Sequence, residues 1–98
     1  MHSFWLWERR GTMATVLVLH DVDDVDHWLS SPKREELFGP LGITARTFRG
    51  AEGSNQVGLI AEIPDMAVWQ EVLQSEAGAE AMKFDGVRPE TIVVLTEG

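Results

Sequence analysis

Runs of apolar residues, some of them alternating with polar ones, divide the chain into four strand patterns. Each segment is rich in β-branched and aliphatic residues and is bounded by turn residues such as Gly, Pro, Asn and Asp. The predicted strands span residues 15–19, 43–49, 56–63 and 91–95. The second and third strands are separated only by the turn cluster GAEGSN, which predicts a hairpin.

Between the strands, apolar residues recur at helical spacing in two segments. The first covers residues 22–41 and restarts at Pro32, which suits the first turn of a helix capped by Ser31. The second covers residues 65–84, where Asp65 is predicted to cap the start and Ser75 to cap a second short helix. The order βαββαβ predicts a ferredoxin-like α+β fold, in which two broken helices cover one face of a four-stranded antiparallel sheet.

Both faces of the predicted sheet are apolar. Val16 and Val18 point to one side of the first strand and Leu17 and Leu19 to the other, and residues 92–95 repeat this pattern. Because the helices cover only one face, leaving the other in water would forgo about 1.5–3 kcal/mol for each large aliphatic side chain. We therefore expect a homodimer in which the sheets of two copies pack face to face, as a dimeric α/β barrel.

Residues 1–13 are expected to form an N-terminal extension to a single domain of residues 14–98. The apolar run at residues 4–7 is too short to span a membrane, and it precedes its Arg pair, unlike a signal peptide. We expect Met13 to be the natural first residue. The alternative is an arm whose Phe4, Trp5 and Trp7 dock on a partner or fold across the free sheet face.

Composition excludes several classes of partner. The chain has 98 residues, 44% of them hydrophobic, which is enough for one globular domain and too few for two. Sixteen acidic residues against eight basic ones leave a net charge of −8, which repels nucleic acids and anionic membranes. Without cysteine, neither a disulfide nor a thiolate site can form, and we expect a cytoplasmic protein.

A polar cluster, HDVDDVDH at residues 20–27, follows the first strand. Its carboxylates and imidazoles are suitable ligands for Mn, Fe or Zn, but its spacing does not match a calcium-binding loop. The alternative is that one Asp caps the first helix while the others favour its positive end, and we predict no metal site here. The glycine motifs of nucleotide-binding proteins and serine hydrolases are missing from the sequence, so nothing favours those activities.

Three residues of the predicted helix-facing side are candidates for a pocket. His20 ends the first strand on the same side as Val16 and Val18, where an imidazole can act as a general base near neutral pH. Trp28 and Trp69 lie on the inner stripes of their helices and would form an aromatic wall for a flat ligand. The alternative is structural: a strand-end His bonded to a nearby Asp, and two Trp side chains that pack in the core.

Further candidates for ligand contact are Arg46, Phe48 and Phe84. Arg46 and Arg49 lie at odd separation on the second strand and must face opposite sides of the sheet. An inward Arg46 beside Phe48 would anchor an anionic ligand group, whereas an outward one would be an ordinary strand charge. Phe84 ends the apolar stripe of the second helical segment.

Four motifs together resemble the dimeric α/β-barrel superfamily, in particular small bacterial members related to the antibiotic biosynthesis monooxygenases. They are HDVDDVDHW (20–28), SNQVGLIAEIPD (54–65), the helix with Trp69, and GVRPETIVVL (86–95). The resemblance covers residues 14–97 and implies a homodimer. The monooxygenases use Asn, Trp and Tyr in a pocket between sheet and helices. Trp69 matches their Trp, but this chain has no Tyr and its one Asn, Asn55, lies in the hairpin turn.

Haem-degrading relatives add a His on the second helix, and residues 65–84 contain none. The resemblance implies a homodimer with a small apolar pocket, acting as a monooxygenase without a cofactor on an aromatic or polyketide-like molecule. His20 and Trp69 are then the expected catalytic residues, with Trp28, Arg46, Phe48 and Phe84 as the expected ligand contacts. The alternative function is a non-catalytic dimeric module that binds a small molecule or serves a structural role.

Overall fold

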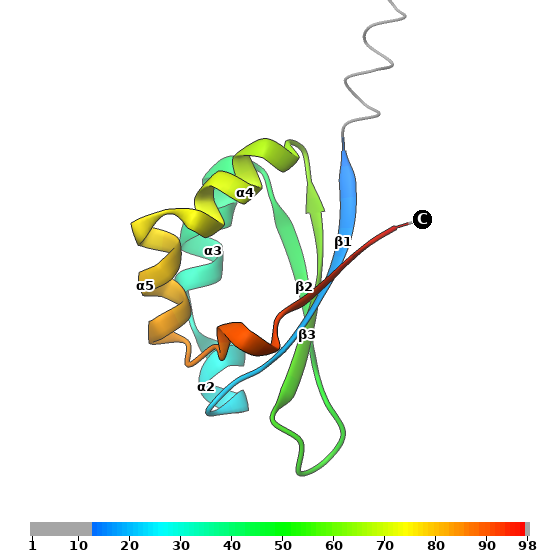
Figure 1. Cartoon of the computed structure of the whole chain (residues 1–98), viewed down its shortest axis with the longest axis vertical. Coiled ribbons are helices and arrows are strands. Elements are labelled where there is room, and N and C mark those ends of the chain that lie inside the picture. Colours follow the sequence, from blue (N-terminus) through cyan, green and yellow to red (C-terminus); the bar gives the residue numbers. More distant parts are fainter. Residues whose placement is uncertain (1–12, 98) are drawn as a thin grey trace, which may run out of the picture.

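A computed structural model describes residues 13–97, and apart from Met13 the predicted N-terminal extension lies outside the described residues. The elements follow the predicted βαββαβ order (Figure 1). They are β1 (Ala14–Asp21), α2 (Val25–Ser30), α3 (Lys33–Phe38), the 3₁₀ turn η1 (Gly39–Leu41), β2 (Thr44–Arg49), β3 (Gln56–Ile63), α4 (Met66–Gln74), α5 (Glu76–Phe84), the 3₁₀ turn η2 (Pro89–Thr91) and β4 (Val93–Thr96). The ferredoxin-like fold is therefore confirmed.

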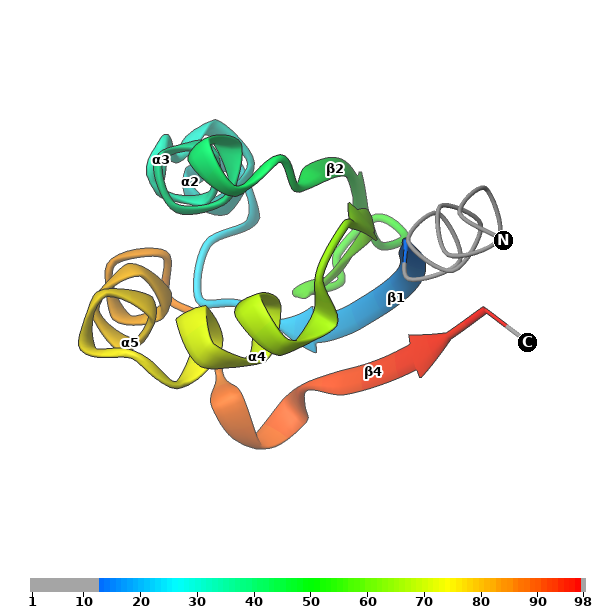
Figure 2. The ribbon, with the colours of Figure 1, turned by 90° about the horizontal axis from the view of Figure 1, so that it is seen from above.

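The strands form one antiparallel sheet in the order β2-β3-β1-β4. Figure 2 shows the sheet with all the helices on one side of it, α2 and α3 over the β2 side and α4 and α5 over the β4 side. The β2–β3 hairpin closes with a hydrogen bond from the Gly50 amide to the Gln56 carbonyl (2.8 Å). None of the helices in residues 13–97 has both the length and the apolar character needed to cross a bilayer.

Side-chain caps start α4 and α5 where the sequence predicts them, but the predicted cap by Ser31 is wrong: α3 has Pro32 as its N-cap, without a side-chain cap, and the Ser31 hydroxyl accepts from the Lys33 amide instead. Asp65 accepts hydrogen bonds from the Ala67 and Val68 amides, and Ser75 accepts one from the Gly78 amide. Asp24 is the residue of the acidic cluster that caps α2, by accepting from the His27 amide. These bonds satisfy amides that have no partner within the first turn of a helix.

The core lies between the inner sheet face and the helices. Buried side chains alternate along β1 and β3, and Trp28 and Trp69 close the core from α2 and α4. The residues of β1 and β3 that face the helices are Val16, Val18, His20, Val57, Leu59, Ala61 and Ile63.

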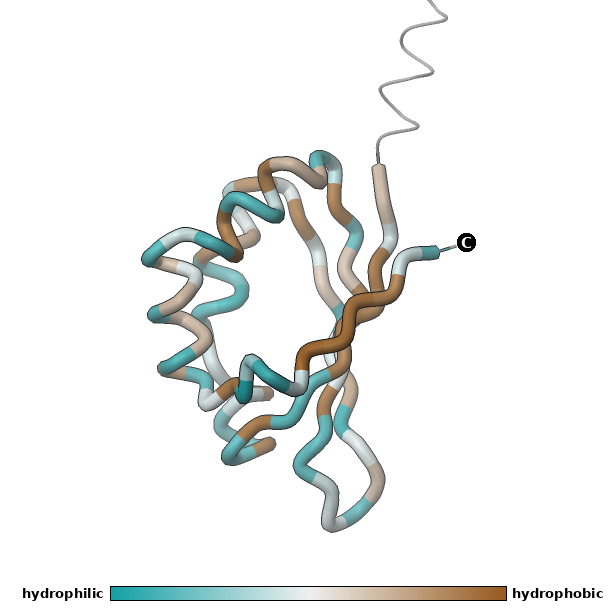
Figure 3. The backbone as a smooth tube through the Cα atoms, viewed as in Figure 1, coloured by the Kyte–Doolittle hydropathy of each residue, from teal (hydrophilic) through white to brown (hydrophobic). Residues whose placement is uncertain are grey.

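The opposite side of the sheet, here called the outer sheet face, is also apolar. It consists of Leu17, Leu19, Phe48, Ile60, Val93 and Leu95, which the register places in adjacent rows. Leu17 pairs with Ile60 on one side and Leu95 on the other, and Leu19 pairs with Val93. Figure 3 shows the brown, hydrophobic tube along β4 where it crosses β1. The predicted second apolar face is therefore present, and no helix of the described chain covers it.

One glycine is essential to the packing of α4 against α5. A Cβ at Gly78 would overlap the backbone carbonyl oxygen of Val72, at the end of α4, so Gly78→Ala must push the helices apart. We expect this variant to lower the free energy of unfolding by about 1–3 kcal/mol, measured by urea denaturation. Gly39→Ala is the matched control, because the added Cβ there meets only the movable carboxylate of Glu35. Equal stability of the two variants would contradict the expectation.

Candidate functional site

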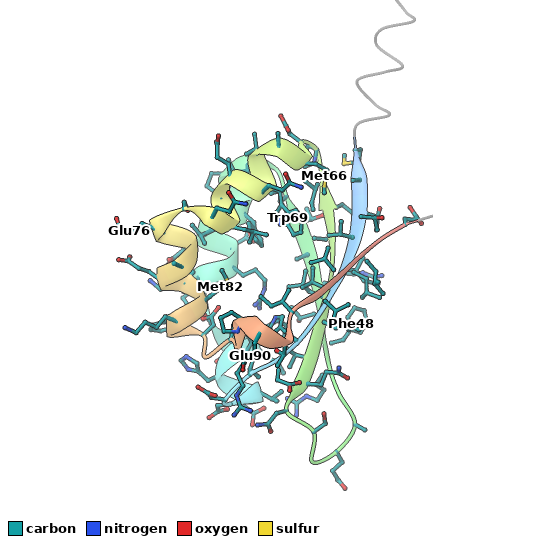
Figure 4. All side chains as sticks on the ribbon, in the orientation of Figure 1. Phe48, Met66, Trp69, Glu76, Met82 and Glu90 are labelled. Atoms are coloured by element: carbon teal, nitrogen blue, oxygen red, sulfur yellow. The ribbon has the colours of Figure 1, made fainter. Side chains whose placement is uncertain are left out.

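A cavity of about 200 Å³ lies between the inner sheet face and the helices. Most of its wall is apolar, with Val18 and Leu59 from the sheet and Phe38, Leu73 and Met82 from the helices. Figure 4 labels Trp69 and Met82, which project from α4 and α5 toward the sheet. The lining residues Ile92 and Val94 are 36% and 43% exposed, so the cavity reaches solvent beside the edge strand β4.

His20 is the first of three polar side chains in this wall. It is 5% exposed, and its Nδ1 lies 3.4 Å from the carbonyl oxygen of Asp21. A carbonyl only accepts hydrogen bonds, so Nδ1 carries the proton of the neutral ring and Nε2 keeps a free lone pair. Nε2 makes no hydrogen bond to any residue of the described chain. The ring is therefore a base with an unused acceptor in an apolar cavity.

Burial sets the protonation of His20. Desolvation disfavours the charged imidazolium and lowers the pKa of His20 below its ordinary 6.5, and the charge of Arg34 lowers it further. The hydrogen bond to Asp21 and the charges of Asp21 and Asp85 oppose this shift only in part. His20 is consequently neutral near pH 7, the state in which Nε2 can accept a proton.

Trp28 and Arg34 form the side of the cavity nearest α2 and α3. The edge of His20 meets Trp28 with ring centroids 5.5 Å apart, and the guanidinium carbon of Arg34 lies 4.5 Å from the Trp28 centroid. An Arg Nη2 also donates to the Trp28 carbonyl at 3.5 Å. Burial lowers the pKa of Arg34, and the charge of Asp85 partly offsets this. Arg34 is thus held over an aromatic ring, facing the cavity.

Asp85 is the third polar group. It ends α5, is only 6% exposed and lines the cavity. Its Oδ1 is buried and has no hydrogen-bond partner among residues 13–97. The sequence did not predict Asp85 or Arg34 as cavity residues. An Asp before Gly is typical of a turn, and an Arg in a helix is typical of an exposed surface.

Solved structures share this architecture. A crystal structure of an antibiotic biosynthesis monooxygenase matches with a TM-score of 0.58 at 15% identity, over 88% of this chain and 97% of that chain. The chain has the fold of that monooxygenase. A conserved protein from Bacteroides thetaiotaomicron, described as a possible oxidoreductase, matches with a TM-score of 0.51 at 13% identity, over 88% of this chain and 94% of that chain. A protein of the ethyl tert-butyl ether d family from Bacillus halodurans matches with a TM-score of 0.50 at 13% identity, over 88% and 97%. No protein-family model and no curated protein matches the sequence.

Within this fold, the predicted site residues divide into two groups. His20, Trp28 and Trp69 come together around the cavity. Arg46 and Phe48 instead lie on the outer sheet side, where the Arg46 guanidinium carbon is 5.7 Å from the Phe48 centroid. Strand alternation turns Ala45, Thr47 and Arg49 toward the helices, so Arg46 and Phe48 point the other way.

Phe84 is also outside the cavity. It is 50% exposed at the end of α5, where its ring lies 5.1 Å from that of His27 and 5.2 Å from Lys33 Nζ. Arg46, Phe48 and Phe84 therefore all lie outside the cavity.

The acidic cluster after β1 makes structural contacts. Asp23 pairs with Arg88 at 2.9 Å and Asp26 pairs with Arg49 at 2.8 Å, both on the surface. Arg49 and Arg46 therefore face opposite sides of the sheet, as predicted. Among residues 13–97, no three His, Asp or Glu side chains gather as metal ligands.

Proposed function

We propose that this chain binds a small aromatic molecule in the cavity and acts on it as a monooxygenase-like enzyme without a cofactor. The observation that carries the proposal is the unused Nε2 acceptor of neutral, buried His20 in a mostly apolar cavity walled by two Trp side chains. An apolar cavity with few, convergent polar groups is typical of small-molecule sites. Flat rings pack well against Trp faces, which favours an aromatic ligand.

The cavity volume limits the ligand to about one ring. An engineered apolar cavity of about 150 Å³ holds one benzene molecule. A cavity of about 200 Å³ leaves room for a single ring with small substituents, or for one ring of a larger polyketide-like molecule whose remainder extends out beside β4.

His20 supplies the chemistry that such a ligand needs. A phenol hydroxyl in the cavity would donate a hydrogen bond to Nε2 and pass its proton there as the ring gives electrons to the oxidant. With molecular oxygen as the oxidant, a phenol and O₂ give a quinone and water: one oxygen atom forms the new carbonyl, and the other leaves as water with two hydrogens from the phenol. Trp28 and Trp69 would hold the ring and exclude water from it.

We also propose that the protein is a homodimer joined through the outer sheet face. This face exposes Phe48, Val93 and Leu95 by 46%, 48% and 49%, beside the half-buried Leu17 and Leu19. A second copy supplies a matching apolar face about a two-fold axis, which is the simplest cover for a surface of this kind. The sequence resemblance to the dimeric α/β-barrel superfamily implies the same assembly.

A cavity-filling variant tests the ligand site. Ala81 is buried in the cavity wall, whereas Ala79 is exposed on the same helix. We expect phenol to quench Trp fluorescence of the wild-type protein and of Ala79→Leu, but not of Ala81→Leu, because the larger side chain occupies the cavity. Oxygen uptake with phenols should be lost in parallel.

Other outcomes separate the alternatives. If phenol fails to bind the wild-type protein, or binds Ala81→Leu equally well, the cavity is not the ligand site. Binding without oxygen uptake for any phenol would favour the non-catalytic module.

A further inference from the structure

Asp85 is placed at an unfavourable position for a carboxylate. It ends α5, where the helix carbonyls carry partial negative charge, and its buried Oδ1 receives no hydrogen bond from the part of the chain that the structure describes. A buried polar atom without a partner destabilises a fold, so such atoms are rare and call for an explanation. The charge of Arg34 attracts that of Asp85, but within the described chain no hydrogen bond or close ion pair reaches Oδ1.

The backbone nevertheless holds Asp85 firmly in place. Its amide donates to the Ala81 carbonyl, and Gly86 follows with a positive φ of 72° that turns the chain out of the helix. The Gly86 carbonyl then accepts from the Asp23 amide at 3.0 Å. Asp85 thus lines the cavity as part of an ordered turn.

Two residues that line the same cavity therefore carry acceptors that the described chain leaves unused, His20 Nε2 and Asp85 Oδ1. They are near enough that the charge of Asp85 raises the pKa of His20 and that of Arg34. A ligand with one hydroxyl satisfies one acceptor and leaves the other without a donor.

Resting on the proposed function, we propose that Asp85 is a specificity-determining residue that binds a second hydrogen-bond donor on the aromatic ligand. The ligand class is then a ring with two donors, such as a dihydroxybenzene or an aminophenol. His20 takes the hydroxyl that loses its proton, and Asp85 accepts from the other donor. Hydrogen bonds to a carboxylate are stronger than those to neutral acceptors, so Asp85 distinguishes this class from simple phenols.

The experiment compares phenol with catechol, resorcinol and hydroquinone, bound without oxygen so that no turnover occurs. Wild-type protein should bind the best of the three dihydroxybenzenes at least about tenfold more tightly than phenol. In Asp85→Leu, which has no acceptor at this position, the ratio of the phenol dissociation constant to that of the best dihydroxybenzene should fall to below about threefold. Asp85→Asn should retain only part of the preference, because a neutral amide accepts more weakly.

Two controls keep the test decisive. Asp65→Asn neutralises an exposed carboxylate and preserves the α4 cap, so the preference should remain. The melting temperatures of Asp85→Leu and Asp85→Asn should be equal to or above that of the wild-type protein, because the unpartnered carboxylate is removed. A clear drop in both would assign Asp85 a structural role instead.

The outcomes separate this inference from the function it rests on. Equal binding of phenol and all three dihydroxybenzenes to the wild-type protein, or a preference that persists in Asp85→Leu, overturns the role of Asp85 and leaves the aromatic site intact. Failure of every probe to bind the wild-type protein overturns both.

Discussion

Replacing Phe48 by glutamate should raise the dissociation constant of the proposed homodimer by at least about 100-fold. Burying one large apolar side chain is worth about 1.5–3 kcal/mol, and a two-fold interface contains each residue twice. Because Phe48 is 46% exposed, only about half of this gain is available, so losing both Phe48 side chains removes about 1.5–3 kcal/mol of association energy, and burying two carboxylates weakens association further. Sedimentation velocity across a concentration series measures this constant directly.

Phe84→Glu is the matched control for this prediction. Phe84 is 50% exposed and Phe48 is 46% exposed, but Phe84 lies on α5, on the helical side of the molecule. The control variant should stay dimeric. A wild-type protein that is monomeric at micromolar concentration, or a Phe48→Glu variant that dimerises normally, would contradict the proposed interface.

Deleting residues 1–12 separates two explanations for how the outer sheet face is covered. If a second copy covers it, the shortened chain should dimerise as the full chain does. If the segment itself covers the face in a monomer, its removal should instead induce association or precipitation, because the apolar patch would become free.

The sequence predicts the fold well because its signals are local. Residues 56–63 are predicted as a strand and form β3, and Asp65 and Ser75 cap helices by bonds within three residues. The strand ends that differ from the prediction depend on contacts with residues far away in the sequence. β1 extends to Asp21 because His20 and Asp21 pair with Val57 and Gln56, and β4 begins only at Val93 because η2 occupies the preceding residues.

The sequence predicts only part of the site, and the residues that it does not predict are the two charged ones. Periodicity places His20, Trp28 and Trp69 on inward faces, and those faces enclose the cavity. Nothing in a local pattern distinguishes Arg34 or Asp85 from surface charges, since only tertiary packing buries them. Strand alternation also predicts that Arg46 and Arg49 lie on opposite faces of the sheet, but it does not predict which of the two faces the helices.

Replacing His20 by glutamine should lower the turnover of a bound phenol by about 100-fold to 10,000-fold, the usual contribution of a general base. Glutamine can hydrogen-bond the ligand but cannot take its proton at neutral pH, so phenol affinity should change much less than the rate. His27→Gln is the matched control, because that imidazole lies on the surface against the Phe84 carbonyl. It should retain the wild-type rate.

The pH dependence gives a second, independent measure of His20. Burial lowers the pKa of His20 below 6.5. The kcat/KM of the wild-type protein should therefore decrease as the pH is lowered, with an apparent pKa below 6.5. The free energy of unfolding should also decrease as the pH is lowered. Between the pKa of His20 in the folded chain and 6.5, the unfolded chain binds more protons than the folded chain. The free energy of unfolding therefore has its full value above pH 6.5 and decreases as the pH falls through this window. His20→Gln should remove both effects. A variant that keeps the acid limb, or a limb centred above 6.5, would exclude His20 as the base and transfer that role to another group in the cavity.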